Sequence, residues 1–191
     1  MKSINMDPKL VEQIAEHYRA IIQLIGEDPE REGLVKTPTR AAKALLENTR
    51  GYAEQPAQII QAAMFDHEGS EIVIVKDIEF YSLCEHHLLP FFGKISIGYI
   101  PSGQIVGLSK LGRIVDSFSR RFQVQERLTA EICHLLAEEL SDDVIVVCEA
   151  SHMCMQMRGV EKQGAKTVSM HYSGVFEQNL AMRAEFLSLI K

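Results

Sequence analysis

Two short segments of this chain carry the side chains that a zinc ion binds. Residues 84–87 read Cys-Glu-His-His, and residues 152–154 read His-Met-Cys. Zinc takes cysteine sulfur and histidine nitrogen in tetrahedral geometry, and a site with three protein ligands keeps one position open for water. We expect Cys84, His87 and Cys154 to be the three ligands, which leaves His86 and His152 beside the metal as free bases.

An open metal position would indicate catalysis, because water bound there has its pKa lowered to about 7. Two simpler interpretations stay open at this point. Cys84 and Cys154 could form a disulfide, and a purely structural zinc site would also pin these distant segments together. The other two cysteines, Cys133 and Cys148, lie in apolar segments and are expected in the core.

The composition fits one sizeable core, or a main domain with a small appendage. The chain has 191 residues, of which 46% are hydrophobic, and its net charge of −6 disfavours a nucleic-acid-binding surface. No apolar run approaches the ~20 residues that span a bilayer, so no membrane segment is expected. The first residues lack the apolar stretch of a signal peptide and the four cysteines are irregularly spaced, which favours a cytoplasmic protein.

The first part of the chain reads as helical, and we assign residues 1–65 to an amino-terminal helical region. Asp7-Pro8 and Thr37-Pro38 each have the cap-plus-proline pattern that starts a helix. Apolar residues follow both pairs at helical spacing, and glycines end the two runs.

Residues 66–191 mix strands with helices and are expected to form the catalytic domain. Strands are predicted over 72–81, 94–100, 104–108, 144–158 and 166–172, with a hairpin turn at 101–103. Helical spacing follows Ser109, continues from Val124 to Leu140, and returns near the carboxyl end. Antiparallel strands with helices grouped between them indicate the α+β class.

The predicted last long strand would place its polar residues on one face. Side chains alternate along a strand, so His152, Cys154, Gln156 and Arg158 would share one side and the intervening methionines the other. The polar side is expected to hold the chemistry.

Two further segments have a polar composition that fits a ligand. Ser109, Lys110 and Arg113 stand at a predicted strand-to-helix junction, where they could cradle a phosphate, although an ordinary cap with solvated charges is the favoured interpretation of this segment taken alone. Gln125 and Glu126 could read a polar heterocycle, since a carboxylate accepts two parallel hydrogen bonds. A solvated linker is the plainer interpretation of that segment.

Taken together in order, four motifs resemble the GTP cyclohydrolase I family. They are Cys-Glu-His-His at 84–87, Gly-Leu-Ser-Lys at 107–110, Gln-Val-Gln-Glu-Arg-Leu-Thr at 123–129, and His-Met-Cys-Met-Gln-Met-Arg-Gly at 152–159. The resemblance extends from Thr-Pro-Thr-Arg at 37–40 to the final helix. It implies zinc-dependent conversion of GTP and water to 7,8-dihydroneopterin triphosphate and formate, the entry to folate or pterin biosynthesis.

The resemblance also implies a fold and an assembly. The expected fold is the tunnelling fold, an antiparallel four-stranded sheet with helices on one face, here preceded by the helical region. Five subunits would close into a ring and two rings would stack into a homodecamer, with active sites between subunits.

The family's functional residues carry over onto matching positions of this sequence. The zinc ligands would be Cys84, His87 and Cys154; the catalytic residues His86, His152 and Ser109; the guanine contacts Gln125 and Glu126; and the triphosphate contacts Ser109, Lys110, Arg113, Arg158 and Arg40. The resemblance places His152 to protonate N7 of the guanine, with His86 and Ser109 relaying protons later.

Two rival functions follow from the same residues. A tunnelling-fold nitrile reductase would use a cysteine nucleophile and NADPH, whereas paired cysteines beside histidines favour a metal. A non-catalytic module would use Cys84 and Cys154 only as a structural zinc site or a disulfide. Zinc analysis and formate release from GTP distinguish the three.

Overall fold

The computed structural model describes residues 6–191, and the chain divides into two compact units between Arg50 and Gly51. The first unit holds helices α1 (Pro8–Leu24) and α2 (Thr37–Asn48), which lie against each other. Asp7 caps α1 as predicted, because its carboxylate accepts the main-chain N–H of Lys9 at 3.0 Å. Thr37 is already inside α2 and makes no side-chain cap, so the cap predicted there is wrong.

A short 3-10 turn, η1 (Arg50–Ala53), leads along the chain to α3 (Pro56–Gln61). Helix α3 lies against α4 (Leu108–Ser119) and α5 (Gln125–Glu139) and has Ile60 fully buried in their core. In the structure this helix therefore packs with the sheet unit, although the sequence groups it with the helical region over residues 1–65.

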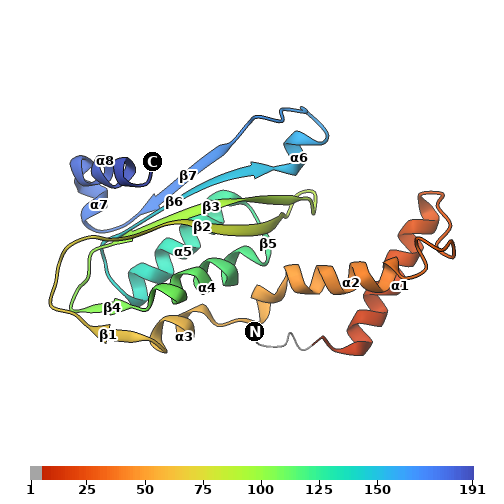
Figure 1. Cartoon of the computed structure of the whole chain (residues 1–191), viewed down its shortest axis with the longest axis horizontal. Helices are drawn as coiled ribbons and strands as arrows, with labels where there is room; N and C mark the ends of the chain where they lie inside the picture. The colour runs from red at the N-terminus through yellow and green to blue at the C-terminus, as the bar shows by residue number, and fades with distance from the viewer. Residues whose placement is uncertain (1–5) are drawn as a thin grey trace. The chain divides into compact units, whose positions relative to one another are not determined.

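The main sheet has five strands in the order β5-β2-β3-β6-β7 (Figure 1). Strands β2 (Val73–Cys84), β3 (Pro90–Tyr99), β6 (Val144–His152) and β7 (Thr167–Tyr172) pair antiparallel, as the predicted four-stranded sheet requires. The fifth strand, β5 (Phe122–Gln123), was not predicted. It joins parallel to the end of β2, so the sheet is mixed rather than purely antiparallel.

The hairpin predicted from 94–100 into 104–108 is wrong. Strand β4 (Gln104–Val106) pairs instead with β1 (Met64–Asp66) in a separate two-stranded sheet. The reason is that β2 and β6 already occupy both edges of β3. A turn after β3 can therefore carry the chain away from the sheet but cannot add a neighbouring strand.

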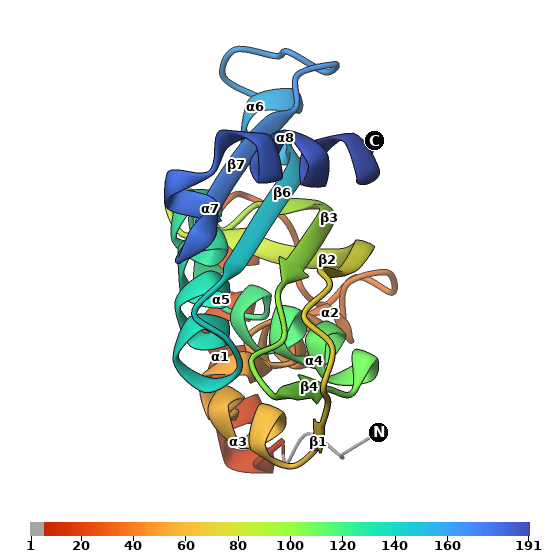
Figure 2. The ribbon, with the colours of Figure 1, turned by 90° about the vertical axis from the view of Figure 1, so that its left-hand side faces the viewer.

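Helices cover both faces of the sheet, although the family resemblance implies helices on one face only. On one face α4 and α5 bury alternating strand residues such as Phe80, Ile95 and Val146. On the other, α7 (Val175–Gln178) and α8 (Leu180–Leu189) lie over β6 and β7 (Figure 2). Phe176 and Phe186 of these helices pack with residues of β6. No helix within residues 6–191 is both long and apolar enough to cross a membrane.

The strand predicted over 144–158 ends at His152, where a helical turn, α6 (Met153–Gln156), begins. The neighbouring strand ends there too, because Phe91 pairs with His152 and β3 begins at Pro90. After His152 the backbone has no β3 residue to pair with, so its N–H and C=O groups form hydrogen bonds within the helical turn instead. The predicted alternation of Cys154, Gln156 and Arg158 on one strand face is therefore wrong, because these residues follow a turn of helix.

Candidate metal centre and active site

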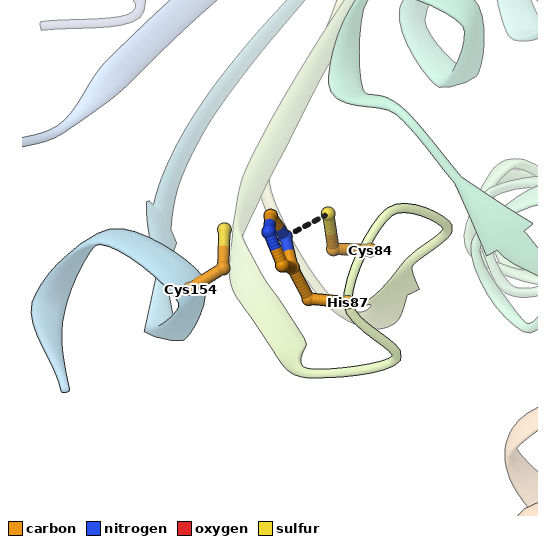
Figure 3. Close-up of side chains that lie close together, drawn as sticks. All are labelled: Cys84, His87 and Cys154. Atoms are coloured by element: carbon orange, nitrogen blue, oxygen red, sulfur yellow. Dashed lines mark hydrogen bonds between the residues drawn. The ribbon is translucent and has the colours of Figure 1, made fainter. Parts of the chain in front are cut away.

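Cys84, His87 and Cys154 converge at one end of the sheet. One ligand atom from each lies within 4.8 Å of the other two (Figure 3). Cys84 is the last residue of β2, His87 belongs to the turn that follows, and Cys154 lies in α6. The strand and the helical turn thus bring together residues that are far apart in sequence, as the ligand spacing predicts.

The turn after β2 is closed by its own main chain. The Cys84 carbonyl accepts the N–H groups of His87 and Leu88, and the Cys84 N–H donates to the Leu89 carbonyl. Leu88 takes a left-handed conformation with φ 55°, which costs strain for a residue with a branched side chain. This tight turn places the ring Nδ1 of His87 3.9 Å from the Cys84 sulfur.

The donor set fits zinc in both chemistry and spacing. Two sulfurs bound at about 2.3 Å to one tetrahedral ion lie about 3.8 Å apart, so the observed cluster needs only a small contraction. All four cysteines are free thiols. Burial raises the pKa of Cys154 and the nearby Cys84 sulfur raises it further, so the Cys154 thiol resists ionisation unless a cation compensates.

His152 lies beside this cluster with its ring held on two sides. It stacks on the Phe91 ring, with centroids 4.8 Å apart and planes 1° from parallel. Its Nε2 lies 2.8 Å from Oε1 of Gln125. Burial lowers the pKa of His152, and the nearby Glu126 carboxylate opposes this shift.

Gln125 is 1% exposed, and its amide fixes the tautomer of His152. The amide nitrogen donates to the carbonyls of Cys148 and Thr167, both at 3.0 Å, so the amide oxygen must be the atom that faces the imidazole. An amide oxygen only accepts hydrogen bonds. His152 therefore carries its hydrogen on Nε2, and the Nδ1 lone pair is left for proton transfer.

His86 and Arg158 also lie against the cluster. The Nδ1 of His86 is 3.9 Å from the Cys84 sulfur, and its ring meets that of His87 edge-on at 6.2 Å between centroids. A guanidinium nitrogen of Arg158 lies 3.4 Å from Nε2 of His87. The site thus holds one cationic side chain close to the ligands.

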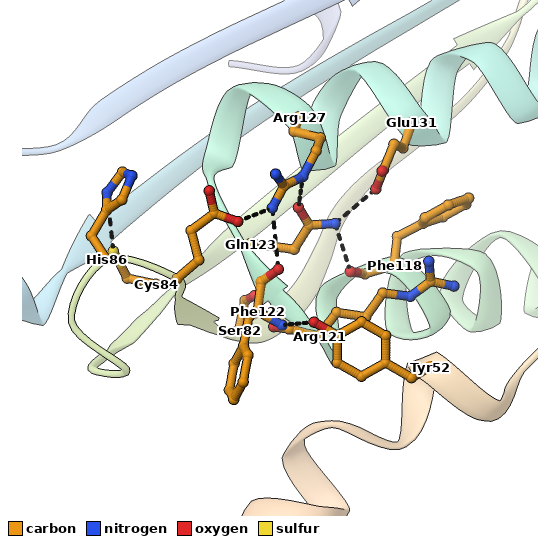
Figure 4. Close-up of polar contacts among 11 residues, drawn as sticks. Tyr52, Ser82, Cys84, His86, Phe118, Arg121, Phe122, Gln123, Arg127 and Glu131 are labelled. Carbon is orange, nitrogen blue, oxygen red and sulfur yellow. Dashed lines mark hydrogen bonds and ion pairs between the residues drawn. The ribbon is translucent and has the colours of Figure 1, made fainter.

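A polar network behind the site ties the turn to α5 (Figure 4). Arg127 pairs with the Glu85 carboxylate and also donates to the Gln123 side-chain oxygen at 2.9 Å. The Glu85 N–H donates to the Gln123 carbonyl at 3.0 Å. Gln123 is 2% exposed, and its amide nitrogen donates to the Phe118 carbonyl and the Glu131 carboxylate. Side chain and main chain together therefore anchor Glu85, next to the expected ligand Cys84.

The sequence interpretation did not single out Glu85, Gln123, Arg127 or Phe91. The first three lie inside the motifs at 84–87 and 123–129, so a signal was present. Their roles depend on α5 starting directly behind the turn, which no local pattern reveals. Phe91 reads as an ordinary core residue.

Comparison with known proteins agrees with this geometry. A protein-family model described as GTP cyclohydrolase I matches residues 14–191.

The chain belongs to the GTP cyclohydrolase I family.

Among its relatives, GTP cyclohydrolase 1 of Porphyromonas gingivalis is 55% identical over 179 residues, which covers 93% of this chain and 92% of that protein. GTP cyclohydrolase 1 of Bacteroides fragilis is 54% identical, covering 95% and 93% of the two chains. The rat protein of the same name is 51% identical, covering 93% and 74%. A solved archaeosine synthase QueF-Like structure in the apo form is 20% identical, with a TM-score of 0.44 over 54% of this chain and 93% of that chain.

The triphosphate contacts expected from the GTP cyclohydrolase I resemblance do not all meet the candidate metal cluster within this chain. Helix α4 ends at Ser119, next to β5, and β5 pairs with Leu83 and Cys84. Ser109 and Lys110 lie at the other end of α4, about 15 Å away at the rise of an α-helix. Gly107, not Ser109, precedes the helix, so Ser109 is not its cap.

Of the remaining expected contacts, Arg113 is exposed one turn into α4, and Arg40 is exposed on α2 in the amino-terminal unit. Glu126 is exposed in the first turn of α5, near enough to His152 to act on it electrostatically. A single chain therefore assembles the candidate metal cluster with His86, His152, Glu126 and Arg158, while Ser109 and Lys110 lie elsewhere.

Proposed function

We propose that this chain is a zinc-dependent GTP cyclohydrolase I that converts GTP and water to 7,8-dihydroneopterin triphosphate and formate, the first step of folate or pterin biosynthesis. The observation that carries the proposal is the convergence of Cys84, His87 and Cys154 beside a histidine of fixed tautomer. The family and the relatives named GTP cyclohydrolase 1 support it.

Zinc would be held by Cys84, His87 and Cys154, and would supply a water molecule acidic enough to be a nucleophile at neutral pH. His152 would exchange a proton with N7 of the guanine through Nδ1, because Nε2–H is already donated to Gln125. His86 would accept or donate protons in the later steps. The stack on Phe91 keeps the His152 ring from rotating out of this position.

The guanine would be recognised chiefly by Glu126. A carboxylate accepts two parallel hydrogen bonds, and the N1–H and 2-amino group of guanine offer two parallel donors. Both amide hydrogens of Gln125 are committed to main-chain carbonyls, so we assign its side chain to holding His152.

The triphosphate would be bound by basic residues from more than one subunit. Arg158 lies at the cluster of its own protomer, whereas Ser109, Lys110 and Arg113 are carried by the far half of α4. A homodecamer of two pentameric rings, with tunnelling-fold sheets joined edge to edge, would bring one subunit's α4 to its neighbour's metal centre. The sheet has two open edges, β5 and β7, as such joining requires. Arg40 would complete the binding of the phosphates. We expect the enzyme to act in the cytoplasm.

The test is to incubate the zinc-loaded protein with GTP and measure formate, together with the fluorescent pterin that forms after oxidation. We expect both products in equal amounts, and their loss after chelation with recovery on adding zinc. A nitrile reductase would instead consume NADPH, and a non-catalytic zinc module would bind the metal but release no formate.

A further inference from the structure

Outside the proposed active site, two imidazoles meet at the surface between α5 and β7. Nε2 of His134 lies 2.9 Å from Nε2 of His171, with ring centroids 4.6 Å apart and planes at 90°. His134 is exposed and His171 is half-buried. The proposed reaction uses neither residue.

Ordered elements hold the two rings in place. His171 pairs with Val146 across the β6–β7 ladder, and His134 lies in the middle of α5. The hydroxyls of Thr129 and Ser169 meet at 2.7 Å and join the same helix to the same strand nearby. The separation of the imidazoles is therefore set by packed secondary structure rather than by loops.

The spacing of the two nitrogens fits a shared metal ion. Imidazole nitrogens bound at about 2.0–2.1 Å and at a right angle to each other lie about 2.9 Å apart, whereas a tetrahedral angle would separate them by about 3.4 Å. Right-angle ligand positions are those of Ni²⁺ and Cu²⁺ in tetragonal nitrogen sites. The measured 2.9 Å matches the right-angle case.

The surrounding groups favour a cation as well. Burial lowers the pKa of His171, and His134 lowers it further, so the imidazole stays neutral and keeps a lone pair for a metal at neutral pH. The carboxylate of Glu177, exposed at the start of α7, lies near enough to act on His171 with the opposite sign. It would attract a positive ion to the pair.

We propose that His134 and His171 form a second metal site, which takes a divalent first-row transition ion, Ni²⁺ or Cu²⁺ above all, with water completing its coordination. Without an ion, one ring donates its Nε2 hydrogen to the other. When an ion binds, that ring moves its hydrogen to Nδ1 through solvent, and both Nε2 lone pairs face the metal. The bound ion ties α5, whose first turn carries Gln125 and Glu126, to the edge strand β7. This inference does not depend on the proposed function.

The experiment titrates Ni²⁺ into the zinc-loaded protein by calorimetry and measures released zinc in the same samples. We expect one Ni²⁺ per chain to bind without release of zinc, and the thermal midpoint to rise with Ni²⁺. His134→Gln and His171→Gln should each weaken Ni²⁺ binding by about tenfold or more. His67→Gln, which removes a histidine elsewhere in the sheet unit, is the matched control and should bind as the parent does.

Both variants change side chains away from the candidate metal cluster, and a circular-dichroism spectrum and zinc content equal to the parent's would show that they fold. The proposal is overturned if the parent binds no Ni²⁺ at millimolar concentration. It is equally overturned if His134→Gln and His171→Gln bind Ni²⁺ as tightly as His67→Gln, or if all the bound Ni²⁺ has replaced zinc.

Discussion

The side-chain oxygen of Gln125 accepts the Nε2–H of His152 at 2.8 Å, and this contact sets which nitrogen of the histidine can react. The glutamine is buried and held by two main-chain carbonyls, so it cannot turn to present its nitrogen instead. Under the proposed function Gln125 would therefore act on the substrate through His152, as a positioning residue.

Gln125→Ala is expected to lower kcat for formate release by about 10–100-fold while the KM for GTP changes little. The reason is that the alanine variant leaves both His152 tautomers accessible. Nitrogen NMR of the His152 ring should show the Nε2–H form in the parent and a mixture in the variant. Gln104→Ala, which alters an exposed glutamine on β4, is the control. A raised KM with unchanged kcat would instead assign Gln125 to guanine binding.

Arg127→Met should weaken zinc binding by about 10–100-fold, because the Glu85 carboxylate and the adjoining metal turn lose their anchor. Chelator competition measures this directly. Lys166→Met breaks the exposed ion pair with Glu149 and is the matched control, expected to leave zinc affinity unchanged. The double variant Glu85→Arg with Arg127→Glu exchanges the two charges and keeps the ion pair. It should bind zinc more tightly than Arg127→Met does. Zinc affinity of Arg127→Met equal to that of the parent would show that the network does not position the turn.

Mixing two inactive variants tests whether the site is shared between subunits. Lys110→Met removes an expected triphosphate contact, and Cys154→Ser removes an expected metal ligand. Mixed assemblies should regain a fraction of the parent's formate release, because some sites then combine an intact α4 with an intact metal cluster. The two variants mixed after separate assembly, without exchange of subunits, are the control. Activity that never exceeds that of the separate variants would place both residues in one subunit's site.

The pKa of His171 is lowered from its ordinary value of 6.5, first by burial and then by His134, while Glu177 opposes the shift. The unfolded chain therefore takes up a proton at this residue at a higher pH than the folded chain. It follows that the free energy of unfolding falls as the pH drops through 6.5 toward the folded-state pKa. His171→Gln should show a smaller loss of stability between pH 7.5 and pH 5.5 in urea unfolding. An identical pH dependence in parent and variant would contradict this.

Local chemistry predicts that Cys84 and His87 come together, because they lie three residues apart and one turn suffices to join them. The four antiparallel strands also follow from alternation and apolar runs. The failures have a common physical cause. Whether a segment becomes strand depends on a free neighbouring edge, and no local pattern shows that β3 has none for 104–106 or that its pairing with β6 ends at His152.

The same limit applies to the candidate site. Gln125 and Glu126 are adjacent in sequence and read as one recognition pair, yet the first turn of α5 buries one and exposes the other. Glu85 and Arg127 are ordinary surface charges until the fold places α5 behind the metal turn.

The most direct test of a catalytic metal held by two sulfurs and one nitrogen combines elemental analysis with formate release for the parent and Cys154→Ser. The parent should contain about one zinc per chain and release formate from GTP, whereas the variant should lose both the zinc and the product. A Cys154→Ser protein that binds no metal and still releases formate at the parent's rate would contradict the account.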